Sequence, residues 1–563
     1  MNQFYYIRAM SPDTSYRKAW VYAGIIACTT LLLLPFLGSV NLFDTDETNY
    51  AESAREMITT GNYLTVQIDY EPFPEKPPLF FWLQVLSMKL FGINEFAARF
   101  PNLICGILSM VMLYYLGRQL YGHRFGMLWI LSYGSAILPF FFFKSGIIDP
   151  WFNLFIFMGI ARFIFYLDPA RERTRLSNLV FSALFFGLAT LTKGPVAIII
   201  FLLCFLMFLI FRRFRISTTT SHVLLFSLVL ILTGGSWYLF QAIQGNTSML
   251  GDFISYQLQL FTSGSSAHEG FFGYHVVVLL LGVFPASVIA MKSITKKSES
   301  TELQRIFRLW MYLLLGVVIV LFSLVHTKLL HYSSLAYFPM TFLAAWVWEK
   351  WIDRKIEVGR WQVALIYLIA LLFAALAILF PLLADHHEWL LSRDFNFLGE
   401  FTRAALQRDV HWSGYELFIG IFLILGVTVA SVQILRRDRR GMLILHLVVL
   451  LYVFGALSVF TERVESYSQR VAIKFYQSLK GQDVYVKPLG FESYAHLFYF
   501  EKAPSEEDDS LERLMNDALQ KDAYFVMKVN RKETYLERYP ELEVVLEKDG
   551  YVIAVRRAAP EVP

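Results

Sequence analysis

Cysteine is scarce in this chain, and its placement excludes two kinds of site. The 563 residues include only three cysteines, Cys28, Cys105 and Cys204, and each lies inside an apolar run. None belongs to a CxxC pair, so the sequence predicts neither a disulfide framework nor a thiolate metal centre. We expect all three to be small apolar fillers between packed helices.

Charge is scarce as well. Charged residues make up 17% of the chain and the formal net charge is +4, which gives no reason to expect nucleic-acid binding. Hydrophobic residues make up 56%, and the mean hydropathy is +0.48. A soluble protein of this length could not bury so much apolar side chain, whereas membrane hydrocarbon can serve as its solvent. The composition therefore predicts a polytopic α-helical membrane protein.

Long apolar runs are the abundant feature. A membrane-spanning helix needs about 20 mostly apolar residues. The sequence predicts about thirteen such spans, at residues 20–40, 101–117, 125–143, 151–167, 178–192, 194–211, 222–243, 275–291, 309–325, 333–349, 362–384, 415–435 and 441–460. No small-residue cleavage site follows the first run, so we expect a span there and not a removable signal peptide.

The positions of Lys and Arg orient these spans, because cytoplasmic loops collect basic residues. With a cytoplasmic N-terminus, all the strongly basic clusters lie inside, provided that the short apolar piece 79–91 does not span. We expect that piece to lie along the outer membrane surface. The long polar segments 41–100, 244–274, 385–414 and everything after about residue 461 then lie outside. Long polar segments on one face indicate that the function is carried there.

The composition changes after residue 460. Short apolar runs at 484–486, 524–529, 544–546 and 551–555 predict strands, and residues 510–519 have the apolar spacing of a helix. We therefore divide the chain into a transmembrane domain, 1–460, and a small soluble α/β domain, 461–563. The second domain has no motif that indicates a chemical reaction. Three functions remain as alternatives for it: a lid, a partner-docking surface and a passive cap.

The segment after the first span is the most informative. Residues 43–52 read Phe-Asp-Thr-Asp-Glu-Thr-Asn-Tyr-Ala-Glu, with Asp46 and Glu47 adjacent. A carboxylate just outside the bilayer can act as a general base at the depth of a lipid-borne headgroup. The alternative is a solvated acidic loop with no chemical role.

An ordered series of motifs favours the chemical interpretation. The series runs Asp46-Glu47, Tyr50-Ala51, Glu75-Lys76-Pro77-Pro78, Asp149-Pro150, Thr192-Lys193-Gly194-Pro195, Trp237-Tyr238, Lys328 and His331-Tyr332. In this order it resembles the GT-C glycosyltransferases of the protein O-mannosyltransferase and aminoarabinose transferase superfamily, over roughly residues 41–340. The resemblance implies a bacterial inner-membrane enzyme. Such an enzyme moves a sugar from a polyprenyl-phosphate donor to lipid A, a protein or an envelope glycan outside the membrane.

The resemblance also implies residue roles. Asp46 would be the catalytic base, Glu47 would support it, and Asp149 would be a second acid facing the same cavity. Lys76 would bind the lipid phosphate, because a fixed cation stabilises a leaving group that gains negative charge. Further candidates for phosphate contact are Lys193, Lys328, His331 and Tyr332. For Lys193 and Lys328 the alternative is snorkelling at helix ends.

Two further points come from the comparison with the family. In the aminoarabinose transferases a His near the position of His268 can hold a metal together with the Glu that corresponds to Glu75, so a divalent metal is an expectation; otherwise no cofactor is expected. Two ligands are too few for a closed site. This chain has Asn49 where those enzymes carry Arg in an Asp-Glu-x-Arg-Tyr pattern. The difference weakens the expectation of an aminoarabinose substrate, and it leaves the class unchanged.

Two other classes remain as alternatives. A secondary transporter of an envelope precursor would place ionisable residues near the bilayer midplane and would often show repeated halves. Here the acids gather in an outer loop, and no repeat is visible. A non-catalytic membrane receptor that presents the C-terminal domain is the third possibility.

Overall fold

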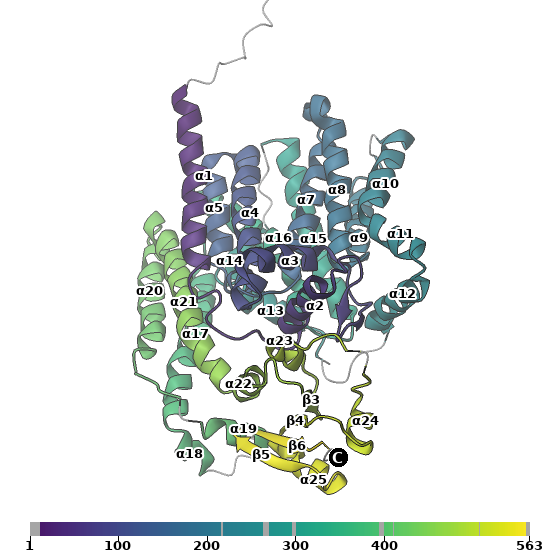
Figure 1. The fold of residues 1–563 in the computed structure, drawn as a ribbon. Coiled ribbons are helices and arrows are strands. Elements are labelled where there is room, and N and C mark those ends of the chain that lie inside the picture. The colour runs from purple at the N-terminus through teal and green to yellow at the C-terminus, as the bar shows by residue number, and fades with distance from the viewer. Residues whose placement is uncertain are drawn as a thin grey trace, which may run out of the picture.

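The computed structural model describes residues 12–215, 218–262, 270–294, 300–392, 399–408, 410–505 and 507–558. Within these residues the chain is a helical bundle with a small sheet below one end (Figure 1). Among the predicted site residues, His268 lies outside the described part.

The bundle contains six single helices that are long and apolar enough to cross a membrane, counted over the described residues. They are α4 (Glu95–Tyr121), η1 (Pro169–Thr174) continued by α8 (Arg175–Lys193), α15 (Glu302–Leu324), α17 (Arg360–Asp385), α20 (Leu417–Leu435) and α21 (Arg439–Ser466). Three bent helix pairs raise the number to nine. The chain is therefore a multi-pass membrane protein.

The bent pairs share a break of a few residues between two helices. They are α5 (His123–Gly134) with α6 (Ile137–Phe143), bent by 76°; α10 (Thr220–Gly234) with α11 (Ser236–Ile243), bent by 54°; and α13 (Tyr274–Gly282) with α14 (Ala286–Ala290) and η3 (Met291–Ser293), bent by 110°. Pro285 lies at the sharpest bend and Gly235 at the mildest. Proline and glycine are usual causes of helix kinks, because proline lacks an N–H and glycine leaves the backbone free.

Four more helices coincide with predicted spans: α1 (Pro12–Leu33), α7 (Asp149–Tyr166), α9 (Val196–Phe211) and α16 (Tyr337–Ile352). Every predicted span thus contains a helix, although α1 ends at Leu33 and the predicted first span extends to residue 40. The count of thirteen spans nevertheless stays a prediction, because these four helices are short or insufficiently apolar to pass as single spans. Helix α16 forms the centre of the bundle, where Trp346 and Trp348 are wholly buried.

The end of the bundle that faces the sheet carries several short elements. They are α2 (Asp46–Thr60), the hairpin β1 (Gln67–Ile68) and β2 (Glu71–Pro72), α3 (Leu79–Phe91), α12 (Thr247–Thr262) and η4 (Leu330–Ala336). The apolar piece 79–91 is helical, and α2 and α3 lie toward the end of the bundle that faces the sheet (Figure 1).

The C-terminal part contains the four predicted strands. They are β3 (Tyr485–Leu489), β4 (Ala523–Lys528), β5 (Glu543–Lys548) and β6 (Tyr551–Arg556), in the order β3-β4-β6-β5. Strands β3 and β4 are parallel and the other two pairs are antiparallel. The predicted helix appears as α24 (Leu511–Asn516), which Ser510 caps by accepting a hydrogen bond from the Arg513 N–H.

Further short helices connect these parts: α18 (His387–Leu391), α19 (Glu400–Leu406), α22 (Arg470–Ser478), α23 (Ala495–Phe500), η5 (Val529–Arg531) and α25 (Lys532–Arg538). Helix α21 continues past residue 460 to Ser466, so the predicted domain boundary falls inside a helix. The division into 1–460 and 461–563 stays a prediction.

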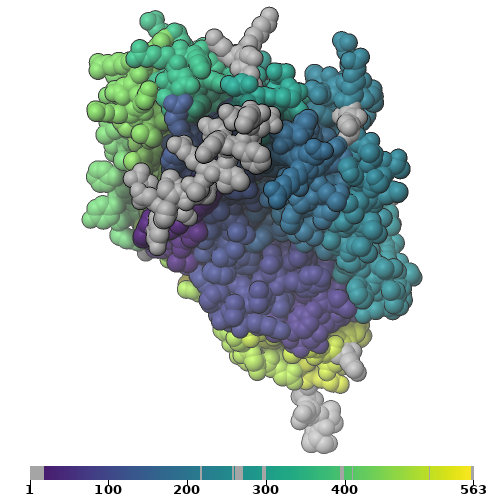
Figure 2. All heavy atoms as spheres, turned by 90° about the horizontal axis from the view of Figure 1, so that it is seen from above, coloured from purple at the N-terminus to yellow at the C-terminus, as the bar shows by residue number. Residues whose placement is uncertain are grey.

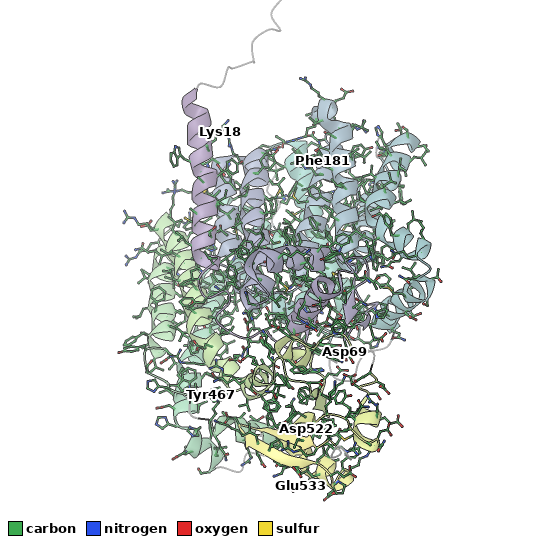
Figure 3. The ribbon with its side chains drawn as sticks, viewed as in Figure 1. Lys18, Asp69, Phe181, Tyr467, Asp522 and Glu533 are labelled. Atoms are coloured by element: carbon green, nitrogen blue, oxygen red, sulfur yellow. The ribbon has the colours of Figure 1, made fainter. Side chains whose placement is uncertain are left out.

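Figure 3 labels Lys18 and Phe181 away from the sheet, Asp69 at the junction of bundle and C-terminal part, and Asp522 and Glu533 within that part. Viewed from the end where α1 begins, the yellow C-terminal residues emerge at one edge, beside the purple and blue N-terminal residues (Figure 2).

Candidate active site

A cavity of about 130 Å³ lies where segments from distant parts of the sequence meet. Its charged and hydrogen-bonding lining residues are Asp46, Tyr50, Glu75, Lys76, Asp149, Asn153, Lys193, Tyr256, His331 and Tyr332. A larger cavity of about 620 Å³ lies between α1, α5 and α21, but its lining is almost wholly apolar. The smaller cavity is therefore the candidate site.

Asp46 is the first residue of α2, and its half-buried side chain lines the cavity. The positive end of a helix dipole favours a negative charge at this position. No ion pair joins Asp46 to another residue in the described ranges. One turn further along α2, Tyr50 is buried edge-on against Phe80 and Phe81, with ring centroids 5.9 and 5.7 Å away. Asp46 is thus a carboxylate that faces the cavity without a fixed cation of its own.

Glu47 does not line the cavity; it is engaged in a buried network with Arg99 of α4. Arg99 donates through Nε and Nη2 to the two carboxylate oxygens, at 3.0 and 2.8 Å. The same guanidinium donates to the carbonyls of Leu37, Val40 and Asn41. Glu47 also accepts hydrogen bonds from backbone N–H groups. Glu47 thus fixes the start of α2 against α4.

Lys76 lies in the loop between β2 and α3, and only 8% of it is exposed. Its Nζ lies 3.5 Å from Glu75 Oε2 and 5.0 Å from the centre of the Tyr256 ring. Burial lowers the pKa of the Lys76 ammonium, and the neighbouring Glu75 carboxylate opposes this shift. A second anion beside Lys76 would favour its charged form further, so the position suits a phosphate.

Asp149 and Lys193 form an ion pair across the cavity, with Nζ 2.6 Å from Oδ1. Asp149 begins α7, and Pro150 follows it at the start of the helix. Lys193 ends α8, where Gly194 reverses the chain with a φ of +93° that other residues rarely adopt. The Thr-Lys-Gly-Pro motif thus delivers a lysine into the cavity at a helix junction, and that lysine is paired with Asp149 in this structure.

His331 and Tyr332 belong to η4, and both line the cavity. The Lys193 Nζ lies 5.5 Å from the centre of the Tyr332 ring. Asn153 of α7 donates a hydrogen bond of 2.7 Å to the hydroxyl of Ser334 in η4. This bond anchors η4 to the bundle.

Lys328 does not line the cavity. Its buried ammonium donates to three carbonyls at the C-terminal end of α15, those of Phe322, Ser323 and Val325. A cation at this position caps the free carbonyls of the helix and interacts favourably with its dipole. Lys328 is absent from the cavity lining, and its contacts explain its burial without a phosphate.

The predicted metal pair is incomplete in the described residues, because His268 lies outside them. Within those residues no three His, Cys, Asp or Glu side chains are grouped as a metal site. Glu75 does line the cavity, but the Lys76 ammonium beside it disfavours a cation there. The Glu75–His268 metal pair therefore stays a prediction, and no step below uses a metal.

Several residues of the site were not assigned a role from the sequence. Tyr256 and Asn153 line the cavity, and Arg99 anchors Glu47. Tyr50 belongs to the Tyr50-Ala51 motif, for which the sequence indicates no role. Trp237, from another motif, donates a hydrogen bond of 2.7 Å to the Leu64 carbonyl and so holds the loop between α2 and β1. No spacing in the sequence marks Tyr256, because it lies far from every motif.

The chain is similar to several known proteins. Residues 75–237 match the family described as dolichyl-phosphate-mannose-protein mannosyltransferase. An "undecaprenyl phosphate-alpha-4-amino-4-deoxy-L-arabinose arabinosyl transferase 2" from Proteus mirabilis is 26% identical over 46% of this chain and 48% of its own length. A similarly named protein from Pectobacterium carotovorum is 26% identical over 71% of this chain and 74% of its own length. The chain therefore matches about half the length of the first of these relatives.

The fold has a clear counterpart among solved structures. The crystal structure of ArnT from Cupriavidus metallidurans bound to undecaprenyl phosphate superimposes with a TM-score of 0.75 at 19% identity, over 97% of this chain and 100% of that one. Its apo structure gives 0.74 at 18% identity. The fold is thus the GT-C fold of a multi-pass membrane protein with a small C-terminal strand-containing region. The chain is thus similar in sequence to the aminoarabinose transferases, and it shares the fold of ArnT.

Proposed function

We propose that this protein is a membrane glycosyltransferase that moves a sugar from a polyprenyl-phosphate donor to an acceptor outside the membrane. One observation carries the proposal: the cavity places the Asp46 carboxylate together with two lysines, Lys76 and Lys193. A base and fixed cations in one partly buried cavity are what sugar transfer from a phosphate requires.

In the reaction, Asp46 takes the proton of the acceptor nucleophile, which then attacks the anomeric carbon of the sugar. The bond between that carbon and the phosphate oxygen breaks, and its electron pair stays on the phosphate. The lipid phosphate leaves with one more negative charge, which the ammonium of Lys76 stabilises. The proton ends on Asp46, and solvent or the departing phosphate removes it.

Lys193 differs from Lys76 in its partner, because the Lys193 ammonium forms an ion pair with Asp149. We propose that Asp149 holds Lys193 toward the cavity, where the ammonium can also contact a phosphate oxygen. His331 and Tyr332 complete the wall on the same side and can donate hydrogen bonds to the donor.

The proposed donor is a sugar on undecaprenyl phosphate or a similar polyprenyl phosphate. The names of the relatives and of the ArnT complex support this class. The acceptor is lipid A, another envelope glycan or a protein. Asn49 is 93% buried in this chain, and it supplies no cation at the place where the aminoarabinose transferases carry Arg. The particular sugar therefore needs direct identification.

We place the protein in the bacterial inner membrane, with a cytoplasmic N-terminus and with the cavity and C-terminal part outside. The distribution of basic residues supports this orientation. A transporter of an envelope precursor is disfavoured, because Asp46, Asp149 and Lys193 lie at helix ends and not within spans. Nothing in the structure favours the receptor alternative.

The test uses purified full-length protein in detergent with a radiolabelled polyprenyl-phosphate sugar and envelope lipid extract. We expect free polyprenyl phosphate and a labelled acceptor to form in equal amounts, and mass spectrometry identifies the acceptor. A protein that moves the intact donor between vesicle leaflets without cleaving it would be a transporter, and the proposal would then be wrong.

A further inference from the structure

The hairpin that follows α2 contains an unfavourable turn. Asp69 and Tyr70 connect β1 and β2 and have φ of +55° and +63°. A two-residue turn of this type prefers Asn-Gly, because most side chains clash with the backbone when φ is positive. Such a conformation persists only where the surroundings hold it, and residues of this kind cluster at functional sites. The surroundings of this turn are therefore informative.

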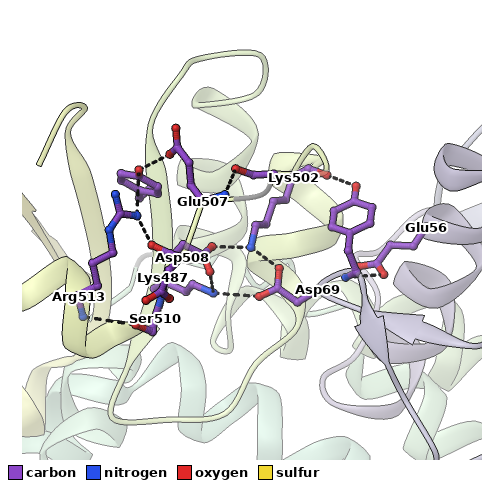
Figure 4. Close-up of polar contacts among 12 residues, drawn as sticks. Glu56, Asp69, Lys487, Lys502, Glu507, Asp508, Ser510 and Arg513 are labelled. Carbon is purple, nitrogen blue, oxygen red and sulfur yellow. Dashed lines mark hydrogen bonds and ion pairs between the residues drawn. The ribbon is translucent and has the colours of Figure 1, made fainter. Parts of the chain in front are cut away.

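Four charged residues hold the turn against the C-terminal part (Figure 4). Lys487 of β3 lies 2.9 Å from one Asp69 oxygen, and Lys502 pairs with the other. The same two lysines pair with Asp509 of the C-terminal part. Asp69 is thus the one member of this charge cluster that belongs to the outer loop.

Tyr70 and Arg55 extend the connection into α2. The Tyr70 N–H donates to Glu56 at 2.9 Å, and the Tyr70 hydroxyl donates to the Lys502 carbonyl at 2.5 Å. Arg55 donates to the same Lys502 carbonyl at 2.9 Å and forms a two-point ion pair with Glu52. The C-terminal part of the chain therefore contacts α2 directly, near the C-terminal end of that helix.

A second set of contacts lies just before α2. The Tyr499 hydroxyl accepts a hydrogen bond of 2.7 Å from the Leu42 N–H, and the Gln469 side-chain amide donates 3.0 Å to the Leu42 carbonyl. Both partners of Leu42 come from the C-terminal part. Leu42 precedes Asp46 by four residues, so these bonds fix the chain where it enters the helix that carries the proposed base.

We propose that the C-terminal part acts as a clamp that positions α2, and with it the Asp46 carboxylate, for the reaction. The clamp has two anchors: Asp69 with Lys487 and Lys502 after the helix, and Leu42 with Tyr499 before it. This inference rests on the proposed function, and it assigns the C-terminal part a positioning role. Asp69 and Tyr499 are positioning residues, since neither lines the cavity.

The first test compares two substitutions in the charge cluster. Asp69→Asn removes both ion pairs that cross from the loop to the C-terminal part, whereas Asp509→Asn removes one acid from the same cluster and leaves both crossing pairs. Because misplacing a catalytic group lowers turnover, we expect Asp69→Asn to reduce kcat about tenfold, with the donor KM changed less than about twofold. Asp509→Asn should stay within about twofold of the unmodified protein.

A second pair tests the other anchor. Tyr499→Phe removes the acceptor of the Leu42 N–H, whereas Tyr476→Phe removes a buried hydroxyl that has no hydrogen-bond partner in the described residues. We expect kcat to fall in the first variant and to stay unchanged in the second. Thermal midpoints are measured for all four variants, so that a general loss of folding is recognised.

Hydrogen exchange of residues 46–60 gives a readout that needs no activity. The clamp predicts faster exchange in this segment for Asp69→Asn and Tyr499→Phe than for their controls. Equal exchange and equal kcat in each matched pair would contradict the clamp. If the unmodified protein transfers no sugar, the proposed function fails, and the exchange comparison still decides whether α2 is clamped.

Discussion

Asp46 and Glu47 are adjacent in sequence and have different surroundings. Successive residues of a helix point about 100° apart, so only Asp46 faces the cavity, while Glu47 turns toward Arg99 of α4. The sequence could place both acids beside the first span. The resemblance gave the two acids different roles, but it could not show what holds Glu47, because the partner of Glu47 lies 52 positions away and no motif marks it.

The first prediction concerns this pair. Asp46→Asn should abolish transfer, by about 10²–10⁴-fold for loss of a general base, with the thermal midpoint unchanged. Glu47→Gln should instead lower the midpoint, because removing one partner of a buried ion pair costs about 3–5 kcal/mol. Turnover and midpoint of the two purified variants provide the check. Unimpaired turnover in Asp46→Asn would exclude it as the base.

The second prediction compares Lys76 with Lys328, which the sequence analysis also named as a candidate for phosphate contact. Lys76→Ala should lose about 10²–10³-fold in rate, because a fixed charge on the leaving group is worth roughly 3–4 kcal/mol in a water-poor site. Lys76→Arg should retain part of the activity, since the charge remains.

Lys328→Ala is the matched comparison. It removes a helix cap, so we expect a lower thermal midpoint and a rate per folded molecule within about twofold of the unmodified protein. The assay is donor cleavage in detergent beside thermal unfolding. A rate loss for Lys328→Ala as large as that for Lys76→Ala would return Lys328 to the phosphate site.

Helix α2 is unusual among the elements in carrying buried acids on two successive turns, Glu52 and Glu56. Glu52 is neutralised by Arg55, whereas Glu56 accepts a backbone hydrogen bond from Tyr70. Burial, together with the neighbouring Glu52, raises the pKa of Glu56 to about 8. The helix is therefore sensitive to pH through one side chain.

The third prediction follows from that shift. A glutamate in an unfolded chain titrates near pH 4.3, so folded α2 binds a proton that the unfolded segment releases. The resulting stability is fully present below about pH 4.3 and is lost as the pH rises through about 8. Hydrogen exchange in residues 46–60, corrected for intrinsic rates, should thus be faster at pH 9 than at pH 6. In Glu56→Gln this difference should disappear; a persisting difference would assign the effect to another group.

Element by element, the sequence predicted helices better than their bends. Each predicted span contains a helix, because long apolar runs leave few other structures in a membrane. The three sharp bends were not predicted, although Pro285 and the pair Gly234-Gly235 marked two of them. In the C-terminal part, short runs of residues that favour strands predicted all four strands. Nothing in these runs indicated that β3 and β4 pair in parallel.

For the whole molecule, the orientation in the membrane is the fourth prediction. Reporter fusions near Asn62 and near Asn94, on either side of α3, should both report an external position, because α3 has only 13 residues and a span needs about 20. A fusion in the basic segment 436–440 should report a cytoplasmic position. An internal signal at Asn94 would reverse every later loop and would separate Asp149 from the outer face.

The site as a whole could be predicted only in part. The ordered motifs contain eight of the residues that line the cavity: Asp46, Tyr50, Glu75, Lys76, Asp149, Lys193, His331 and Tyr332. Tyr256 and the contacts of the C-terminal part could not be found, because they depend on how segments hundreds of positions apart pack together.

The bond between Leu42 and Tyr499 also has a consequence for biosynthesis. The two residues are 457 positions apart, so a ribosome must add almost all of the intervening helices before the bond can form. At about 5–20 residues per second, α2 would lack this anchor for tens of seconds after Asp46 has been synthesised. A nascent chain would therefore acquire its full transfer activity only after synthesis has passed Tyr499, and incomplete chains left in the membrane would consume little of the lipid-linked donor.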